Sequence, residues 1–373
     1  MIVGVPKEIK TAEHRIAITP VGVRELTDRG HEVLIEKDAG DGSSLHDEDF
    51  EAQGATIVPS AADVFEGAEM ILKVKEPQAS EVAMFREGQI LFTYLHLAAY
   101  PELAAGLLKR GIIAIAYETV QLEDRSLPLL APMSEIAGRM ATQAGAYFLA
   151  KAQGGRGILL GGVTGVSPAK VVIIGGGMAG SNAAVIAMGM QGDVVVLDTD
   201  INKLRMLDSL YQGRIVTLHS NKLTLEEQVL DADLVIGTVL VPGASAPKLV
   251  TQDMVRSMRR GSVLVDVAID QGGCFETSRE TTHTEPVYDV HDVLHYAVGN
   301  IPGAVPHTST YALTNATLRY AVTLAEEGVT TAVSRHPELE AGVNIVGGSV
   351  CHPAVAASLG VDHVTVEDAI ARM

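Results

Sequence analysis

The 373-residue sequence contains no tryptophan, two cysteines, and aromatic residues at only 4% of the chain. So few aromatic side chains argue against a surface on which the bases of single-stranded nucleic acid stack. Cys274 and Cys351 are too few for a disulfide scaffold and lack metal-ligand spacing, so we expect reduced thiols. No apolar run approaches the roughly 20 residues of a membrane helix, and we expect no membrane partner.

Positive charge is also in short supply. The chain carries 28 Lys and Arg against 46 Asp and Glu, a formal net charge of -18. This balance opposes binding to nucleic-acid phosphates, and we expect no nucleic-acid partner. The first residues, MIVGVPKEIKTAEHR, lack a basic segment followed by an apolar stretch and a small-residue cleavage site. A cytoplasmic location is therefore the expectation.

Apolar residues, by contrast, are abundant at 47%, and the chain is longer than the roughly 250 residues of a single core. Short Val/Ile-rich runs alternate with Ala/Leu-rich helical segments, a pattern typical of parallel sheets with crossover helices. The pattern predicts an α/β protein with two doubly wound, Rossmann-type domains. The expected strands are 2–5, 32–36, 70–74, 90–93 and 112–116 in the first sheet, and 169–174, 193–197, 214–218, 234–238, 263–267 and 296–298 in the second.

Two long helices are expected to connect the domains. One covers 134–150, with Ser134 as its N-cap, and the other covers 308–327 after a proline-punctuated stretch. The chain after the second helix is expected to return to the first domain. The predicted domains are therefore a discontinuous substrate domain, 1–130 plus 308–373, and a contiguous nucleotide-binding domain, 131–307.

A glycine-rich turn follows the strand 169–174 and precedes a small-residue helix at 181–190. This is the setting that the G-x-G-x-x-G pattern requires. Gly175 permits the tight turn, Gly177 lets the backbone approach a pyrophosphate, and Gly180 lets the helix pack close to the strand. The helix N-terminus then offers free N–H groups to the phosphates. The sequence therefore predicts a dinucleotide site.

Asp198 closes the following strand, where an acidic side chain accepts hydrogen bonds from the adenosine ribose. Its charge would repel a 2′-phosphate, so NAD is favoured over NADP, although the nearby Lys203 weakens that preference. Three further strand ends are expected on the rim that a dinucleotide crosses: 238–240, 267–270 and 298–301.

Four residues near strand ends are candidates for chemistry. Asp270 is expected to end a strand of the second sheet, and His96 closes a strand of the first. Lys75 follows another strand, with Lys73 as its rival because a period of two puts both on one face. Arg15 follows the first strand after a loop. Together they supply a bidentate carboxylate anchor, a carbonyl polariser and two proton shuttles.

At this point the sequence resembles the alanine dehydrogenase family, over the whole chain. The segments that carry the resemblance are GVPKE (4–8), EHRIA (13–17), KVKEP (73–77), TYLHLA (93–98), LLGGVTGV (159–166) and DVAIDQGG (266–273). It implies reversible, NAD-dependent oxidative deamination of L-alanine to pyruvate and ammonium, by an enzyme that is usually a homohexamer.

The resemblance also implies residue roles. Arg15 and Lys75 match positions that hold the substrate carboxylate and carbonyl, and His96 and Asp270 match the catalytic pair. Lys203 stands where family members often have Arg, which keeps the charge but loses the planar fork. The remaining matches to cofactor contacts are Ser134, Met178, Ala179, Asp198, Ser220, Val239, Leu240, Val267, Ala268, Ile269, Asp270, Val298, Gly299, Asn300 and Ile301.

Several alternatives stay open on the sequence. The NAD-binding component of a proton-pumping transhydrogenase shares the glycine motif but needs no substrate anchor, and an enzyme joining another oxo acid to an amine, of the saccharopine-forming type, is a further candidate. An NAD-sensing regulator would keep the dinucleotide site without the four chemical residues. His291 and His295 have the spacing of a helical metal site but no visible third ligand. Glu118 stands at a strand end, a position open to a divalent ion, but no neighbouring residue argues for one. We expect no metal.

Overall fold

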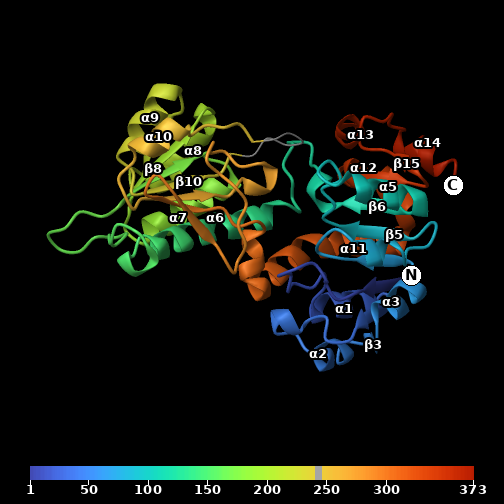
Figure 1. Cartoon of the computed structure of the whole chain (residues 1–373). Helices are drawn as coiled ribbons and strands as arrows, with labels where there is room; N and C mark the ends of the chain where they lie inside the picture. The colour runs from blue at the N-terminus through green and yellow to red at the C-terminus, as the bar shows by residue number, and fades with distance from the viewer. Residues whose placement is uncertain (240–245) are drawn as a thin grey trace. The chain divides into compact units, whose positions relative to one another are not determined.

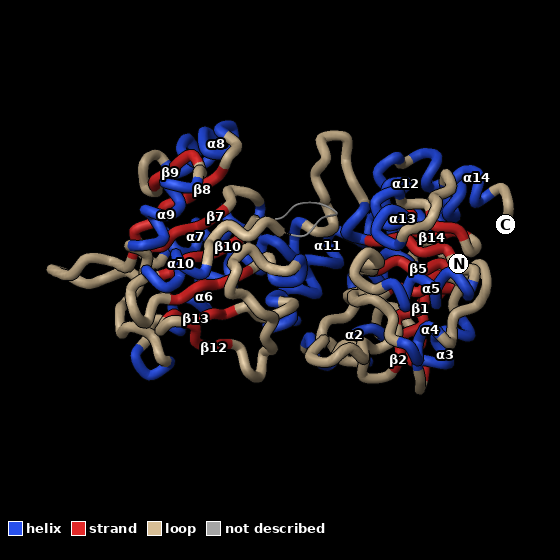
Figure 2. The backbone as a smooth tube through the Cα atoms, turned by 45° about the horizontal axis from the view of Figure 1, so that its top comes forward, coloured by secondary structure: helices blue, strands red, loops and turns tan. Residues whose placement is uncertain are grey.

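The computed structural model describes residues 1–239 and 246–373, which form two compact units (Figure 1). The first unit comprises Met1–Met133 and Val305–Met373, and the second comprises Ser134–Ala304. The divisions thus fall at 133/134 and 304/305, where the sequence suggested 130/131 and 307/308. In Figure 2 the strands of each unit lie together and are flanked by helices.

The first unit is built on an eight-stranded sheet of order β15-β14-β6-β5-β4-β1-β2-β3. Strands β1 to β6 pair in parallel, whereas β14 is antiparallel to both β6 and β15. The sheet is therefore mixed rather than parallel throughout. Its strands are β1 Ile2–Val5, β2 Glu32–Glu36, β3 Thr56–Val58, β4 Met70–Leu72, β5 Ile90–Thr93, β6 Ile113–Ala116, β14 Val343–Val346 and β15 Ser349–Val350.

Proline begins many of the helices in this unit, because its missing N–H and fixed φ suit the first helical turn. It stands in the first turn of α1, α5, α11, α12 and α13. The helices are α1 Pro20–Thr27, α2 Asp47–Glu51, α3 Ala61–Gly67, α4 Ala79–Val82, α5 Pro101–Arg110, α11 Pro306–Arg335, α12 Pro337–Gly342, α13 Pro353–Leu359 and α14 Val366–Ile370, with short 3-10 turns η1 Asp41–Ser43 and η2 Tyr117–Thr119. Helix α11 is longer than the predicted helix 308–327, because it continues past a kink at Gly328.

The second unit contains a seven-stranded sheet of order β12-β13-β11-β10-β7-β8-β9, parallel except for β12. Its strands are β7 Lys170–Ile174, β8 Asp193–Asp198, β9 Val216–His219, β10 Leu234–Gly237, β11 Val263–Asp266, β12 Val287–Val290 and β13 Val293–Tyr296. The strand predicted at 296–298 was wrong, because β13 ends at Tyr296 after pairing antiparallel with β12.

The helices of this unit are α6 Ala131–Phe148, which starts in the last residues of the first unit's range, α7 Met178–Gly189, α8 Ile201–Tyr211, α9 Lys222–Leu230 and α10 Gln252–Ser257, with 3-10 turns η3 Lys151–Gln153, η4 Ile269–Gln271 and η5 Ile301–Ala304. Two predicted helix starts were wrong. Helix α7 begins at Met178 rather than 181, and Ser134 lies inside α6 instead of capping it.

Both faces of the second sheet are covered. On β7, Val171 and Ile173 pack with Ala183 of α7, whereas Val172 and Ile174 pack with Val229 of α9. All four strand residues are buried, as a period of two with apolar layers on both faces requires. The sheet thus holds β7 rigidly and fixes where the glycine turn leaves it. Among residues 1–239 and 246–373, no helix is long and apolar enough to cross a membrane.

Candidate functional site

The glycine turn connects β7 directly to α7, whose N-cap is Gly177. Gly175 has φ +103, a left-handed conformation that favours glycine. At Gly180 a Cβ would lie 1.8 Å from the carbonyl oxygen of Gly175, so only glycine lets the helix pack this close. A Cβ at Gly177 would meet no atom within 4 Å. The protein's own packing therefore explains two of the three glycines.

Asp198, at the end of β8, holds the glycine turn in place. Its Oδ2 accepts a hydrogen bond from the N–H of Gly176 at 2.7 Å, and its Oδ1 accepts one from Asp200 at 2.8 Å. The N–H of Ser220 donates to the Asp198 carbonyl at 2.9 Å. The Nζ of Lys203 lies 3.8 Å from Oδ2, on a half-exposed side chain. A carboxylate has about four lone-pair sites, so Asp198 has acceptor capacity beyond these bonds.

The hydroxyl of Thr238, after β10, donates to the carbonyl oxygens of Ile174 and Gly175, each at 3.0 Å. The sequence predicted that 238–240 lies on the cofactor rim, but it did not predict that Thr238 bonds to the glycine turn. A threonine at the end of a strand next to that turn could have suggested the contact. Val239 is half-buried beside it, and Leu240 lies outside the described residues. Met178 and Ala179 open α7, where a Cβ on Gly138 of α6 would lie 2.0 Å from the Ala179 carbonyl oxygen. The start of α7 is therefore fixed by α6 as well as by β7.

The prediction that Asp270 ends a strand was wrong. Strand β11 ends at Asp266, and Asp270 lies exposed in η4. The N–H of Asn300 donates to Asp270 Oδ1 at 3.3 Å. This bond joins the two predicted rim segments, of which the first also contains Val267, Ala268 and Ile269 and the second Val298, Gly299 and Ile301.

Arg15 is buried and clamped by Glu13, a partner that sequence reasoning missed. Its Nε and Nη2 donate to the two Glu13 carboxylate oxygens at 2.6 and 2.5 Å, and its Nη1 lies 3.0 Å from the sulfur of Met133. Burial alone would raise the pKa of Glu13, but the charge and hydrogen bonds of Arg15 outweigh it and bring that pKa to about 2. The charge of Lys75 lowers it further. Arg15 is thus held in one orientation near Lys75.

The structure separates Lys73 from Lys75. The Nζ of Lys73 is fully buried between Glu8 Oε2 at 2.9 Å and Glu81 Oε1 at 2.7 Å. Such a buried, doubly paired ammonium ion is a structural element. The other oxygen of Glu8 accepts from the N–H groups of Val74 and Lys75, at 2.6 and 3.3 Å. The Lys73 cluster therefore fixes the turn that carries Lys75, directly after β4.

His96 adopts a left-handed backbone conformation, with φ +49. Glu118 of η2 stabilises it: Oε1 accepts from the His96 N–H at 2.6 Å, and both oxygens lie 3.2 Å from the Leu95 nitrogen. The same Oε1 lies 3.7 Å from His96 Nδ1. The Tyr94 ring stacks parallel to the imidazole with centroids 5.9 Å apart. Glu118 is thus occupied by backbone donors, and we assign it no metal role.

The three candidates of the first unit follow neighbouring strands. In the order β5-β4-β1, His96 follows β5, Lys75 follows β4 and Arg15 follows β1 after a loop. The hydroxyl of Thr93 donates to the Lys75 carbonyl at 3.0 Å, which ties two of the turns together. The structure thus gathers an imidazole, an ammonium and a guanidinium group at the carboxyl ends of three neighbouring parallel strands.

The histidine pair does not form a helical metal site. His291 lies in a turn after β12, and His295 is in β13. The buried His295 ring pairs through Nε2 with the hydroxyl of Thr277 at 2.7 Å and through Nδ1 with the Val293 carbonyl at 3.0 Å. In the part of the chain that the structure describes, no group of three or more His, Cys, Asp or Glu could hold a metal ion.

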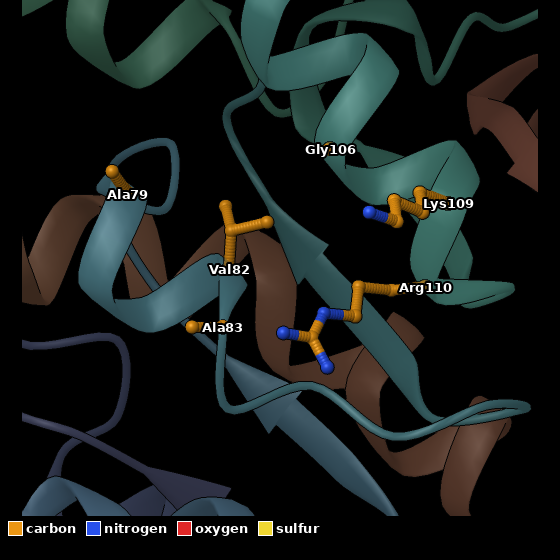
Figure 3. Close-up of a pocket in the computed structure, with 6 residues that line it drawn as sticks. All are labelled: Ala79, Val82, Ala83, Gly106, Lys109 and Arg110. Atoms are coloured by element: carbon orange, nitrogen blue, oxygen red, sulfur yellow. The ribbon is translucent and has the colours of Figure 1, made fainter.

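A surface depression of about 410 Å³ lies between α4 and α5 and contains none of the candidate residues. Figure 3 shows its lining of small side chains with two cations, formed by Ala79, Val82, Ala83, Gly106, Lys109 and Arg110.

Two family models cover nearly the whole chain. The Alanine dehydrogenase/PNT N-terminal domain matches residues 4–137, and the Alanine dehydrogenase/PNT C-terminal domain matches residues 141–353. The chain belongs to the alanine dehydrogenase/PNT family. The resemblance noted in the sequence is thereby confirmed.

Within this family, the chain is similar to curated alanine dehydrogenases. It is 56% identical to that of Methanococcus maripaludis, over 99% of this chain and 100% of the relative. It is also 56% identical to that of Mycobacterium tuberculosis, over 97% of each.

Solved structures agree. A structure titled L-alanine dehydrogenase matches with TM-score 0.94 and 50% identity, over 96% of this chain and 99% of that one. A transhydrogenase from Sinorhizobium meliloti matches with TM-score 0.80 and 27% identity, over 95% and 100%. Both matches confirm the α/β fold with two Rossmann-type sheets. The difference in identity favours the dehydrogenase branch of the family over the transhydrogenase branch.

Proposed function

We propose that the chain is an L-alanine dehydrogenase, which converts L-alanine reversibly to pyruvate and ammonium with NAD. One observation carries the proposal: Arg15, Lys75 and His96 each follow one of three adjacent parallel strands in the first unit. A transhydrogenase component or an NAD sensor has no need of such a set. The full-length similarity to curated alanine dehydrogenases supports the same activity.

In the proposed mechanism, Arg15 binds the substrate carboxylate, because a guanidinium group recognises a carboxylate through parallel hydrogen bonds. The Glu13 clamp keeps that group from turning. Lys75 faces the substrate oxygen and stabilises the negative charge that develops on it. These two cations fix the substrate before the chemical steps begin.

His96 and Asp270 move the protons. The substrate amine must be neutral for hydride to leave Cα, so a base accepts one proton. Water then attacks the iminium carbon and is deprotonated, and the carbinolamine collapses to pyruvate and ammonia as its nitrogen receives a proton and its hydroxyl loses one. We assign these transfers to the pair and leave their order between the two residues open. NAD, when bound, would accept the hydride from Cα.

The second unit is the proposed nucleotide domain. A pyrophosphate would lie against the turn at Gly175 and Gly177 and the N-terminus of α7, where free N–H groups favour anions. The clear space around Gly177 supports this, because the protein's own packing gives no reason for glycine there. Asp198 would accept bonds from the ribose hydroxyls, which favours NAD over NADP. The remaining proposed contacts are Ser134, Met178, Ala179, Gly180, Lys203, Ser220, Val239, Leu240, Val267, Ala268, Ile269, Asp270, Val298, Gly299, Asn300 and Ile301.

We further propose that the protein is a cytoplasmic homo-oligomer and, by analogy with the family, a hexamer. Within residues 159–166, an isolated antiparallel bridge between Val163 and Val166 closes a tight turn. Leu159, Val163 and Val166 are 63%, 60% and 61% exposed. A cluster of exposed aliphatic side chains is typical of a surface that another subunit covers.

Purified protein tests the proposal through the loss of NADH absorbance with pyruvate, with and without ammonium. We expect turnover that requires ammonium and prefers NADH to NADPH, and strong loss of turnover but not of NADH binding in Asp270→Asn. NADH binding without turnover under every condition would instead favour a sensor or a transhydrogenase-like component.

A further inference from the structure

Asp266, the last residue of β11, is a buried carboxylate without an assigned role in the proposed reaction. Its Oδ1 accepts from the Ala268 N–H at 3.1 Å and lies 3.5 Å from the Cys274 sulfur. Its Oδ2 accepts from the N–H groups of Cys274 and Phe275, at 3.0 and 3.4 Å, and from the Ser278 hydroxyl. Five donors from the following segment thus converge on one side chain.

These donors close residues 267–275 into a loop around the carboxylate. The loop folds back on itself through N–H donation from Gln271 and Gly273 to the Ala268 carbonyl, at 2.9 and 3.0 Å. Gly273 has φ +74, and a Cβ there would lie 2.6 Å from Asp266 Oδ2. The backbone therefore approaches Asp266 more closely than any other residue type would allow. Asp270 lies in η4, in the middle of this loop.

The type of side chain matters at this position. An ionised carboxylate only accepts hydrogen bonds and offers about four lone-pair sites, which suits a ring of donors. An asparagine offers one accepting oxygen, and its NH₂ group would face the backbone N–H groups of the loop. A buried charge is tolerated only when it is hydrogen-bonded in this way. The loop geometry therefore depends on a carboxylate at the end of β11.

We propose that Asp266 is a positioning residue. It holds the loop so that the Asp270 carboxylate keeps the position required for proton transfer, beside the Asn300 N–H. The two carboxylates have different tasks: Asp266 is enclosed by the protein, whereas Asp270 is exposed and bonded at 3.3 Å to the second rim segment. The inference rests on the proposed role of Asp270 in proton transfer. Asp266 itself does not touch the substrate.

The test is a double-mutant cycle of Asp266→Asn and Asp270→Asn, with kcat, the KM for pyruvate and the Kd for NADH measured on the full-length protein. We expect Asp266→Asn to lower kcat about tenfold to a hundredfold, since displacement of a catalytic group by about 1 Å has effects of this size. The KM for pyruvate should change less than threefold (~0.6 kcal/mol), and the Kd for NADH, to which residues 267–270 contribute, should rise by a smaller factor than kcat falls. The matched control is Asp208→Asn on the exposed side of α8, which should leave all three constants unchanged.

The cycle distinguishes positioning from general support of the fold. In the Asp270→Asn background, Asp266→Asn should have almost no further effect on residual turnover, because the group that it places is already disabled. An equal fold-loss in both backgrounds, wild-type kcat in Asp266→Asn, or a rise in the Kd for NADH that equals or exceeds the loss of kcat would each overturn the inference.

If Asp266→Asn does not fold, Ser278→Ala removes a single donor, and the same cycle then applies with an expected loss of a few-fold in kcat. Failure of the proposed function has a different signature. Wild-type turnover in Asp270→Asn would remove Asp270 from the mechanism, whereas an inactive Asp270→Asn beside a fully active Asp266→Asn would refute only the positioning role.

Discussion

At the scale of single residues, the left-handed conformation of His96 shows how the site is organised. A non-glycine residue at φ +49 is strained unless its surroundings enforce it. Here one carboxylate, Glu118, binds two successive N–H groups and also lies near the imidazole. Removing that carboxylate should therefore disturb the ring's position more than the stability of the fold.

We predict that Glu118→Gln lowers kcat roughly tenfold, because the amide's NH₂ group replaces an acceptor that faces the Leu95 and His96 N–H groups. Steady-state kinetics with pyruvate, ammonium and NADH measure the change, and the Kd for NADH should stay constant. Glu123→Gln, an exposed substitution in the next loop, is the control. Equal kcat values for the two variants would contradict the prediction.

The Arg15–Glu13 pair predicts a dependence of stability on pH. The Glu13 pKa is about 2 in the folded chain against a usual 4.5, so its ionisation stabilises the fold above pH 4.5 and that contribution is lost as the pH falls toward 2. We expect wild-type stability relative to Glu13→Gln to shrink by about 2 kcal/mol between pH 6 and pH 3. Urea denaturation at a series of pH values measures it. A constant difference would mean that Arg15 does not hold Glu13 ionised.

At the scale of elements, the long apolar runs were the easiest to predict. The expected strands 2–5, 32–36 and 90–93 coincide with β1, β2 and β5. Strands β3 and β15 were missed because they have only three and two residues, and β14 because Asn344 interrupts its apolar run. Strand β12 was missed because none of its four residues is buried and Asp289 interrupts the apolar pattern. Helix α6 starts before Ser134 because Pro132 suits a first helical turn.

The glycine turn gives a prediction that separates packing from binding. Gly180→Ala places a methyl group against the Gly175 carbonyl and should destabilise the second unit by about 1–3 kcal/mol or more. Gly177→Ala meets no protein atom, so its stability cost should be at most about 1 kcal/mol, while the Kd for NADH rises roughly tenfold. Thermal unfolding and NADH fluorescence titration measure the two effects. Unchanged NADH affinity in Gly177→Ala would argue against a pyrophosphate at this turn.

At the scale of the whole molecule, the order and approximate place of most strands could be predicted from the sequence, whereas the partners that hold the candidate residues could not. Glu8 reaches Lys73 across 65 residues of sequence, and Asp266 was hidden because it belongs to the strand that appeared to continue toward Asp270. A charged residue looks like a surface residue until the fold buries it. Long-range ion pairs and loop closures of this kind depend on tertiary structure, which no local pattern encodes.

The proposed assembly can be tested at the same scale. Val163→Glu puts a charge among the exposed aliphatic side chains of 159–166, and a buried unpaired charge in an interface is strongly unfavourable. We expect analytical ultracentrifugation to find a wild-type oligomer and a variant of lower mass. The control is Leu223→Glu on α9, equally exposed at 65% but outside this turn, which should keep the wild-type mass. A wild-type mass for Val163→Glu would place the subunit interface elsewhere, and a monomeric wild type would remove the oligomer from the proposal.

Because a net charge of -18 makes subunits repel one another, assembly should depend on such apolar contacts and tighten with salt.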